Sequence, residues 1–138
     1  MIPKRIFIDT SAFLALGDES DRHHEEAVLF RDQELLLRNY ELITTSYILD
    51  ETLTLIRSRL GIPASIEFSK KLRRSQIVKV LSVSKEMEER AIDLFEQYDD
   101  KTFSFTDCVS FVVMQCMGVP EAFAFDQHFE QMGVVRRP

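Results

Sequence analysis

The stretch IFIDTS, residues 6–11, decides the fold of this chain. Its first three residues are apolar and two of them are β-branched, which is typical of a strand that is buried on both faces. The polar residues Asp9, Thr10 and Ser11 that follow are typical of the start of a helix. A buried strand that runs directly into a helix begins a βαβ unit, so the sequence predicts a parallel sheet from its first strand onward.

The rest of the chain repeats this alternation of strand and helix. Further strands are expected at residues 42–45, 77–83, 122–125 and 134–135. Helices are expected at residues 21–38, 46–60, 64–74, 84–98 and 106–117, with a short helix or turn at 126–132. We therefore predict a single domain over residues 1–138, with a three-layer α/β/α fold around a central, mostly parallel sheet of four to five strands.

Composition and charge exclude some classes of protein. With 45% hydrophobic and 29% charged residues, the chain of 138 residues has the make-up of one folded domain. Its 17 basic and 23 acidic residues give a net charge of −6. That charge excludes a basic protein that coats nucleic acid, but it does not exclude a nucleic-acid enzyme with a local basic track.

The sequence also predicts the location of the protein in the cell and the oxidation state of its two cysteines. The sequence has no apolar run long enough to cross a membrane and no signal peptide at its start, so we expect a cytoplasmic protein. Cys108 and Cys116 lie eight residues apart on one predicted helix, about 12 Å along its axis. That separation is too long for a disulfide, so we expect two free thiols, both buried.

Four acidic residues are expected at one edge of the predicted sheet. Asp9 and Asp126 directly follow strands, Glu51 lies in the first turns of the helix after the second strand, and Asp107 begins the helix that leads into the fourth. Ligands bind at the carboxyl edge of such sheets. At about 100° per residue Glu51 lies next to the apolar face of its helix, whereas Asp50 points away from that face.

Clustered carboxylates repel one another, so they either take up protons or hold cations. An oxygen-only set of ligands suits Mg²⁺ or Mn²⁺, and such ions support phosphodiester hydrolysis. In this interpretation Thr10, Ser11 and Thr106 orient the ligands or a bound water. Each aspartate taken alone is also explained as a helix N-cap, so the residues by themselves leave both interpretations open.

Four segments together resemble the motifs of PIN-domain ribonucleases. They are residues 6–15 (IFIDTSAFLA), 45–52 (TSYILDET), 103–108 (FSFTDC) and 124–129 (AFDQHF), in the family's order and across essentially the whole chain. A free-standing domain of this size is similar to VapC-type toxins of toxin–antitoxin pairs. The resemblance implies the family's parallel sheet flanked by helices.

The resemblance also implies an activity and its partners. It implies an endoribonuclease that uses one or two Mg²⁺ or Mn²⁺ ions, held by Asp9, Glu51, Asp107 and Asp126, and leaves a 5′-phosphate. Asp9 and Asp107 are the expected direct ligands. It further implies an RNA substrate, a small antitoxin as inhibitor and a homodimer. An RNA-processing nuclease outside any toxin pair, and a non-catalytic module that binds RNA or protein, remain open as alternatives.

Basic residues and two rival families complete the sequence reading. Lys70, Lys71, Arg73 and Arg74 form the densest positive run, which is either a solvated helix face or a grip for RNA phosphates. A phosphatase of the haloacid dehalogenase type needs a second aspartate where Ser11 stands. A receiver domain needs an aspartate at the end of the third strand, where this chain has a serine.

Overall fold

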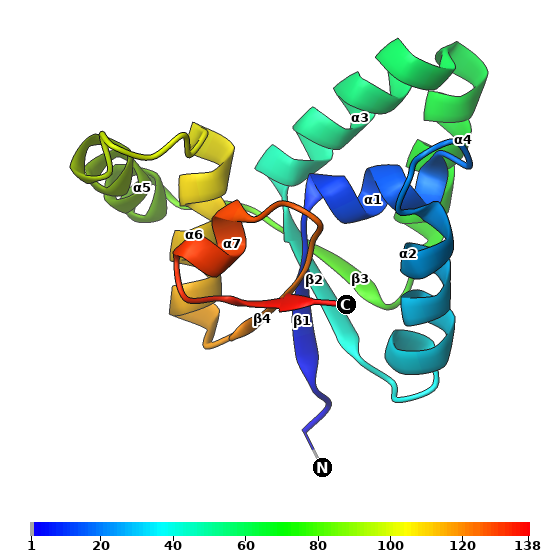
Figure 1. The fold of residues 1–138 in the computed structure, drawn as a ribbon, viewed down its shortest axis with the longest axis horizontal. Helices are drawn as coiled ribbons and strands as arrows, with labels where there is room; N and C mark the ends of the chain where they lie inside the picture. The colour runs from blue at the N-terminus through cyan, green and yellow to red at the C-terminus, as the bar shows by residue number, and fades with distance from the viewer. Residues whose placement is uncertain (1) are drawn as a thin grey trace.

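Five parallel strands form the centre of the molecule (Figure 1). The computed structural model describes residues 2–138. Its strands are β1 (Arg5–Ile8), β2 (Glu41–Thr45), β3 (Val78–Leu81), β4 (Glu121–Phe123) and β5 (Val135–Arg137). They lie in the order β3-β2-β1-β4-β5, and every neighbouring pair is parallel. The predicted fold class is confirmed, with five strands in the sheet.

Helices cover both faces of this sheet. They are α1 (Thr10–Gly17), α2 (His24–Phe30), the π-helix η1 (Arg31–Leu36), α3 (Ser46–Leu60), α4 (Ile62–Arg74), α5 (Lys85–Gln97), α6 (Phe105–Met117) and α7 (His128–Gln131). Figure 1 shows α1, α2 and α4 on one side of the strands, with α5 and α6 on the other. This arrangement gives the three layers that the sequence predicts.

The first strand is buried, as the opening stretch predicts. Ile6 and Phe7 are completely buried because β1 lies between β2 and β4, with a helical layer on each face. Phe7 stands beside Ile43 of β2 and Ala122 of β4 in the register of the sheet. The carboxyl end of β1 is therefore held between two neighbouring strands, which fixes the backbone from which Asp9 projects.

Two predicted helices differ from the structure in detail. The helix predicted at residues 46–60 has Thr45 rather than Ser46 as its N-cap, and the Thr45 hydroxyl accepts the N–H of Ile48 at 3.2 Å. Both residues carry a hydroxyl, so the sequence leaves the choice of cap open by one position. The helix expected over residues 21–38 begins at His24 and continues from residue 31 as a π-helix.

The cysteines and the membrane prediction can also be compared with the structure. Cys108 and Cys116 are both free, as expected. Cys108 is buried but Cys116 is exposed, so the prediction that both are buried is wrong for Cys116, which lies near the solvent-facing end of α6. Within residues 2–138, no helix is long and apolar enough to cross a membrane.

Candidate active site

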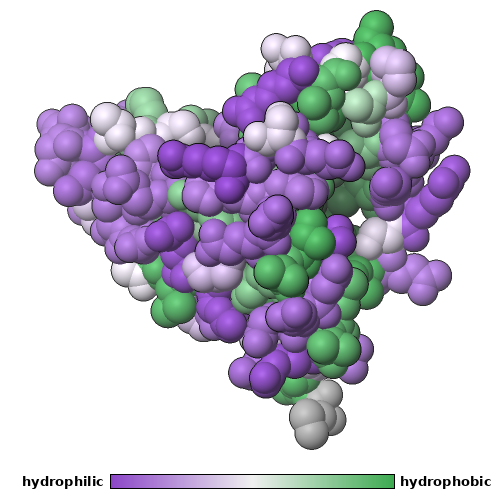
Figure 2. Space-filling model, turned by 45° about the vertical axis from the view of Figure 1, so that its right-hand side comes forward, coloured by the Kyte–Doolittle hydropathy of each residue, from purple (hydrophilic) through white to green (hydrophobic). Residues whose placement is uncertain are grey.

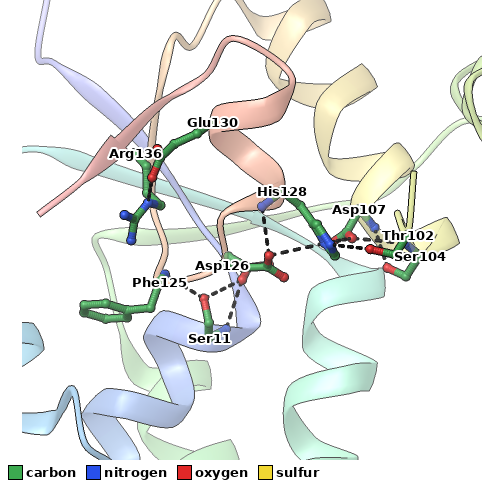
Figure 3. Close-up of polar contacts among 10 residues, drawn as sticks. Ser11, Thr102, Ser104, Asp107, Phe125, Asp126, His128, Glu130 and Arg136 are labelled. Carbon is green, nitrogen blue, oxygen red and sulfur yellow. Dashed lines mark hydrogen bonds and ion pairs between the residues drawn. The ribbon is translucent and has the colours of Figure 1, made fainter. Parts of the chain in front are cut away.

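Asp9 lies at the carboxyl end of β1 and is 5% exposed. It is the N-cap of α1, and its Oδ2 accepts both the backbone N–H of Ser11 at 3.1 Å and the Ser11 hydroxyl at 2.6 Å. The Ser11 Oγ in turn accepts the backbone N–H of Phe125 at 3.0 Å (Figure 3). One serine therefore connects the acid after β1 to the chain after β4.

Asp107 lies in the first turn of α6 and is 8% exposed. Ser104 and Asp107 form a capping box: the Ser104 hydroxyl accepts the N–H of Asp107, and Asp107 Oδ2 accepts the N–H of Ser104, both at 3.0 Å. Such a pair satisfies two backbone donors at a helix start. The cap holds this carboxylate at a fixed position relative to α6.

Asp126 and His128 lie beside Asp107 at the same edge of the sheet (Figure 3). Asp126 Oδ1 accepts the backbone N–H of His128 at 2.9 Å. The imidazole Nδ1 of His128 lies 2.8 Å from Asp107 Oδ2 and 3.2 Å from Asp126 Oδ1, and its Nε2 lies 3.0 Å from the hydroxyl of Thr102. While Asp107 and Asp126 are ionised they only accept, and the Nδ1 that contacts them then carries the ring proton.

Every acid of the acidic cluster, which we define as Asp9, Asp107 and Asp126, also accepts a backbone N–H next to a helix start. The capping interpretation and the site interpretation are therefore not alternatives in this protein. The caps hold the carboxylates in place, and the parallel sheet brings them together from distant parts of the sequence.

Burial and mutual repulsion perturb the ionisation of the acidic cluster. Burial raises the pKa of Asp9 to about 7, against the lowering effect of the Ser11 hydrogen bonds and with a further contribution from the charges of Asp107 and Asp126. Burial also raises the pKa of Asp107, where the charge of Asp126 acts in the same direction. These carboxylates need a cation or a proton to share the site.

The donor set fits a divalent cation. Asp107, Asp126 and His128 each offer one ligand atom, and these three atoms lie within 4.8 Å of one another. Two carboxylates and one imidazole suit first-row ions such as Mn²⁺, while an all-oxygen set suits Mg²⁺. Asp9 adds a third, more deeply buried carboxylate at the adjoining strand end.

Glu51 occupies a different position from the other acids. It is half-buried in the second turn of α3, and the structure records no polar contact between it and the acidic cluster within residues 2–138. Its neighbour Asp50 is exposed, so the predicted orientation of this pair agrees with their burial. The structure brings three of the four predicted acids together and places Glu51 on the helix that starts at the same sheet edge.

Of the three hydroxyl residues predicted to support the site, only Ser11 is seen to bond one of these acids. Thr10 is buried and its Oγ1 accepts from the Thr52 hydroxyl at 3.3 Å, which links α1 to α3. Thr106 is half-buried, and its backbone carbonyl accepts from Ser110 within α6. Thr10 therefore has a structural contact, and Thr106 contributes backbone to its own helix.

Two contacts at the site go beyond the sequence-based expectations. The first is the Ser104 cap of Asp107, which the pattern S-x-x-D before an apolar run would have indicated. The second is the bridging position of His128, which depends on the short turn between β4 and α7. Its place two residues after Asp126 was the only available signal.

The basic run lies away from these contacts, on α4. Lys70, Lys71, Arg73 and Arg74 are all exposed along the last turns of that helix. Lys71 pairs with Glu67, four residues earlier, at 4.0 Å. The four basic residues of this run therefore do not all have the same surroundings, because Lys71 has a carboxylate partner on its own helix.

The protein is thus a parallel α/β protein with a carboxylate-lined site at the carboxyl edge of its strands, where ligands of this class of fold bind. The chain belongs to the PIN domain family, which it matches over residues 6–135. The family that the motifs resemble is thereby confirmed.

Individual relatives are similar over nearly their full lengths. The chain is 35% identical over 130 residues to the 23S rRNA-specific endonuclease VapC20 of Mycobacterium tuberculosis, covering 94% of this chain and 95% of the relative. The crystal structure of that VapC20, described as a Sarcin-Ricin loop cleaving toxin, superposes with a TM-score of 0.86 at 33% identity, covering 94% of this chain and 96% of that one.

A more distant structure agrees in fold alone. FitAcB from Neisseria gonorrhoeae superposes with a TM-score of 0.71 at 12% identity, over 96% of both chains. The TM-score shows that the two proteins share an architecture. At this low identity the comparison says nothing about activity.

Proposed function

We propose that this protein is an endoribonuclease that acts as the toxin of a toxin–antitoxin pair. The observation that carries the proposal is the convergence of Asp9, Asp107 and Asp126 at the carboxyl edge of the sheet. It is supported by 35% identity, over 94% of the chain, to a 23S rRNA-specific endonuclease. Cleavage of RNA by hydrolysis of a phosphodiester bond is the chemistry that such a site performs.

In this proposal Asp9, Asp107 and Asp126 hold one or two Mg²⁺ or Mn²⁺ ions, with Asp9 and Asp107 as direct ligands. Glu51 belongs to the outer part of the site, because α3 begins at the same sheet edge. Bound divalent ions lower the pKa of a water and neutralise charge on the attacking and leaving oxygens of a phosphodiester. The raised pKa values of Asp9 and Asp107 support this assignment, because a bound cation stabilises charged carboxylates that burial, and to a smaller extent mutual repulsion, disfavour.

The chain's own residues position the reacting groups. Ser11 holds Asp9 through two hydrogen bonds and fixes the segment that carries Asp126. His128 contacts Asp107 and Asp126 and is itself oriented by the hydroxyl of Thr102. Attack by water on the side opposite the departing 3′ oxygen leaves a 5′-phosphate on the product.

The proposal also includes a substrate class and partners. We propose a hairpin of large-subunit ribosomal RNA as substrate, by analogy with the Sarcin-Ricin loop cleaving toxin. A toxin of this kind requires a small antitoxin that blocks the site, and we propose that the active form is a homodimer. A ribosomal substrate agrees with the cytoplasmic location that we propose.

The test is cleavage of an end-labelled ribosomal RNA hairpin by the purified protein with Mg²⁺, with Mn²⁺ and with excess EDTA. We expect one dominant cut that requires the metal and is lost in Asp107→Asn. Asp93→Asn is the matched control, because Asp93 is exposed on α5, and it should cleave as the wild type does.

Other outcomes would decide between the alternatives. Full cleavage by Asp107→Asn, or cleavage in excess EDTA, would refute the proposed site. Metal-independent RNA binding without any cleavage would identify a binding module instead. Cleavage of precursor RNA but not of ribosomal RNA, with no toxicity on expression, would identify an RNA-processing nuclease.

A further inference from the structure

A cleft of about 420 Å³ lies between α3 and α4, outside the acidic cluster. Six of the residues that line it are hydrogen-bond donors: Thr54, Arg57, Ser65, Ser69, Lys70 and Arg73. Its volume is within the range of ordinary ligand sites, about 300 to 1,000 Å³. The proposed chemistry at the sheet edge makes no use of this cleft.

The cations of the cleft have no carboxylate partner in the described part of the chain. The structure records no ion pair for Arg57, Lys70 or Arg73 within residues 2–138, whereas Lys71 pairs with Glu67 and Arg59 lies 3.9 Å from Asp21. These three cations line one cleft although the whole chain has a net charge of −6, so the cleft is a locally positive part of an acidic protein. Their positive charge is available to an anion from outside.

One wall of the cleft is fixed in place. The Arg57 Nε donates to the Ser65 hydroxyl at 3.1 Å, and that hydroxyl donates to the Ile62 carbonyl at 2.8 Å. Ser65 is only 3% exposed, so the connection between α3 and α4 is buried. The guanidinium is therefore partly oriented before any ligand binds, which lowers the entropy cost of binding.

Apolar side chains also lie at the cleft: Leu53 and Ile66 line it, and others lie at the nearby turn between α3 and α4. Figure 2 shows apolar side chains gathered at the upper right, where α3 turns into α4, among hydrophilic side chains. The exposed apolar residues of this turn are Leu60, Ile62 and Ile66. A ligand with repeated negative charge and flat apolar faces matches such a surface, and a nucleic acid strand has both.

The position of the cleft relative to the site also favours a nucleic acid strand. Arg57 follows Glu51 by six residues on α3, a distance of about 9 Å along the helix axis. Six residues also rotate the helix by about 600°, so Arg57 lies about 120° around α3 from Glu51, and a strand that passes the carboxyl edge of the sheet reaches the cleft by curving around this helix. Guanidinium, ammonium and hydroxyl groups are the groups that proteins use to contact phosphates.

We propose that the α3–α4 cleft binds backbone phosphates of the RNA substrate through Arg57, Lys70 and Arg73. This inference rests on the proposed function and names where the substrate is held beyond the cut. It divides the basic run of α4: Lys70 and Arg73 line the cleft, while Lys71 and Arg74 lie outside it.

The division of α4 supplies a matched pair of variants for the test. Lys70→Gln/Arg73→Gln removes two charges inside the cleft, and Lys71→Gln/Arg74→Gln removes two charges outside it from the same helix turns. Binding of a labelled ribosomal RNA hairpin is measured in EDTA, so that no cleavage occurs, at several salt concentrations. Cleavage with Mg²⁺ is measured in parallel.

We expect the cleft variant to bind about tenfold or more weakly at low salt. The slope of log K against log salt should fall by about 0.7 to 0.9 for each lost phosphate contact, so by about 1.4 to 1.8 in total. The control should keep the slope within about 0.3 of the wild-type value. In cleavage, the cleft variant should show a raised KM with kcat unchanged.

Equal weakening by both double variants would overturn the inference, because it would show dispersed charge rather than a defined cleft. An unchanged slope in the cleft variant would overturn it as well. So would a poly-glutamate peptide that binds the wild type but not the cleft variant, while RNA binding stays unchanged, because that result would identify a protein ligand. Absence of cleavage by the wild type with intact RNA binding would instead contradict the proposed function alone.

Discussion

Replacing Asp9 by asparagine should abolish cleavage in the presence of Mg²⁺ and should make the metal-free protein more stable at alkaline pH. Asparagine keeps one carbonyl oxygen where Asp9 Oδ2 accepts both Ser11 hydrogen bonds. It also caps a helix as well as aspartate does. The substitution therefore removes the buried charge and leaves the shape of the site in place.

The size of the effect follows from the raised pKa of Asp9. This pKa is about 7 in the folded protein, against the ordinary aspartate value of 3.8. Between these values the folded protein retains a proton that the unfolded chain has lost, so the wild type loses stability as pH rises from about 4 to 7. At 1.36 kcal/mol per pKa unit, the loss amounts to at most about 4 kcal/mol. Asparagine at this position has no such loss.

The assay is urea unfolding in EDTA at pH 5, 6, 7 and 8, followed by circular dichroism because the chain has no tryptophan. Asn in place of Asp9 should give a free energy of unfolding about 2 to 4 kcal/mol above the wild type at pH 8, with the difference shrinking toward pH 5. Asp93→Asn, a change at an exposed acid, should stay within about 0.5 kcal/mol of the wild type. The reasoning is refuted if Asp9→Asn gives no gain at pH 8, or a gain that does not change with pH.

Three further outcomes are expected. Ser104→Ala should lower the free energy of unfolding by about 1 kcal/mol in urea titrations, because the capping box with Asp107 is lost, and Ser104→Thr should recover most of it. His128→Ala should weaken Mn²⁺ binding about tenfold to a hundredfold in calorimetric titrations, and unchanged affinity would show that the imidazole neither ligates the ion nor orients the acids. Addition of Mn²⁺ at 100 times its dissociation constant should stabilise the wild type by about 2.7 kcal/mol in thermal unfolding at pH 8. Asp9→Asn should gain less stability from the same addition. Equal gains would show that Asp9 does not bind the metal ion.

Much of the fold could be predicted because the hydrophobic pattern and the helix-start residues agree. The apolar run before Asp9 indicates a buried strand, and the polar residues after it indicate a helix, as the structure has them. The strand order could not be predicted in the same way. It depends on how the helices pack across both faces, which the local pattern of residues does not encode.

The candidate site was predictable to the extent that it depends on topology. A parallel sheet collects the residues that follow its strands, so Asp9 and Asp126 could be placed together from sequence alone. The contacts of His128 depend on one turn of irregular backbone and on the loop that carries Thr102. Neither segment has a hydrophobic period, so no pattern in the sequence predicts that they meet.

The hydrogen bonds that anchor Asp9, Asp107 and Asp126 to neighbouring backbone have an evolutionary consequence. An aspartate codon becomes an asparagine codon by a single base change, and asparagine satisfies the same backbone N–H groups. One mutation can therefore turn the enzyme into a folded copy that has lost its chemistry but kept its surfaces. Such a copy would still occupy RNA and any inhibitor, so a duplicated gene could become an antagonist of the original in one step.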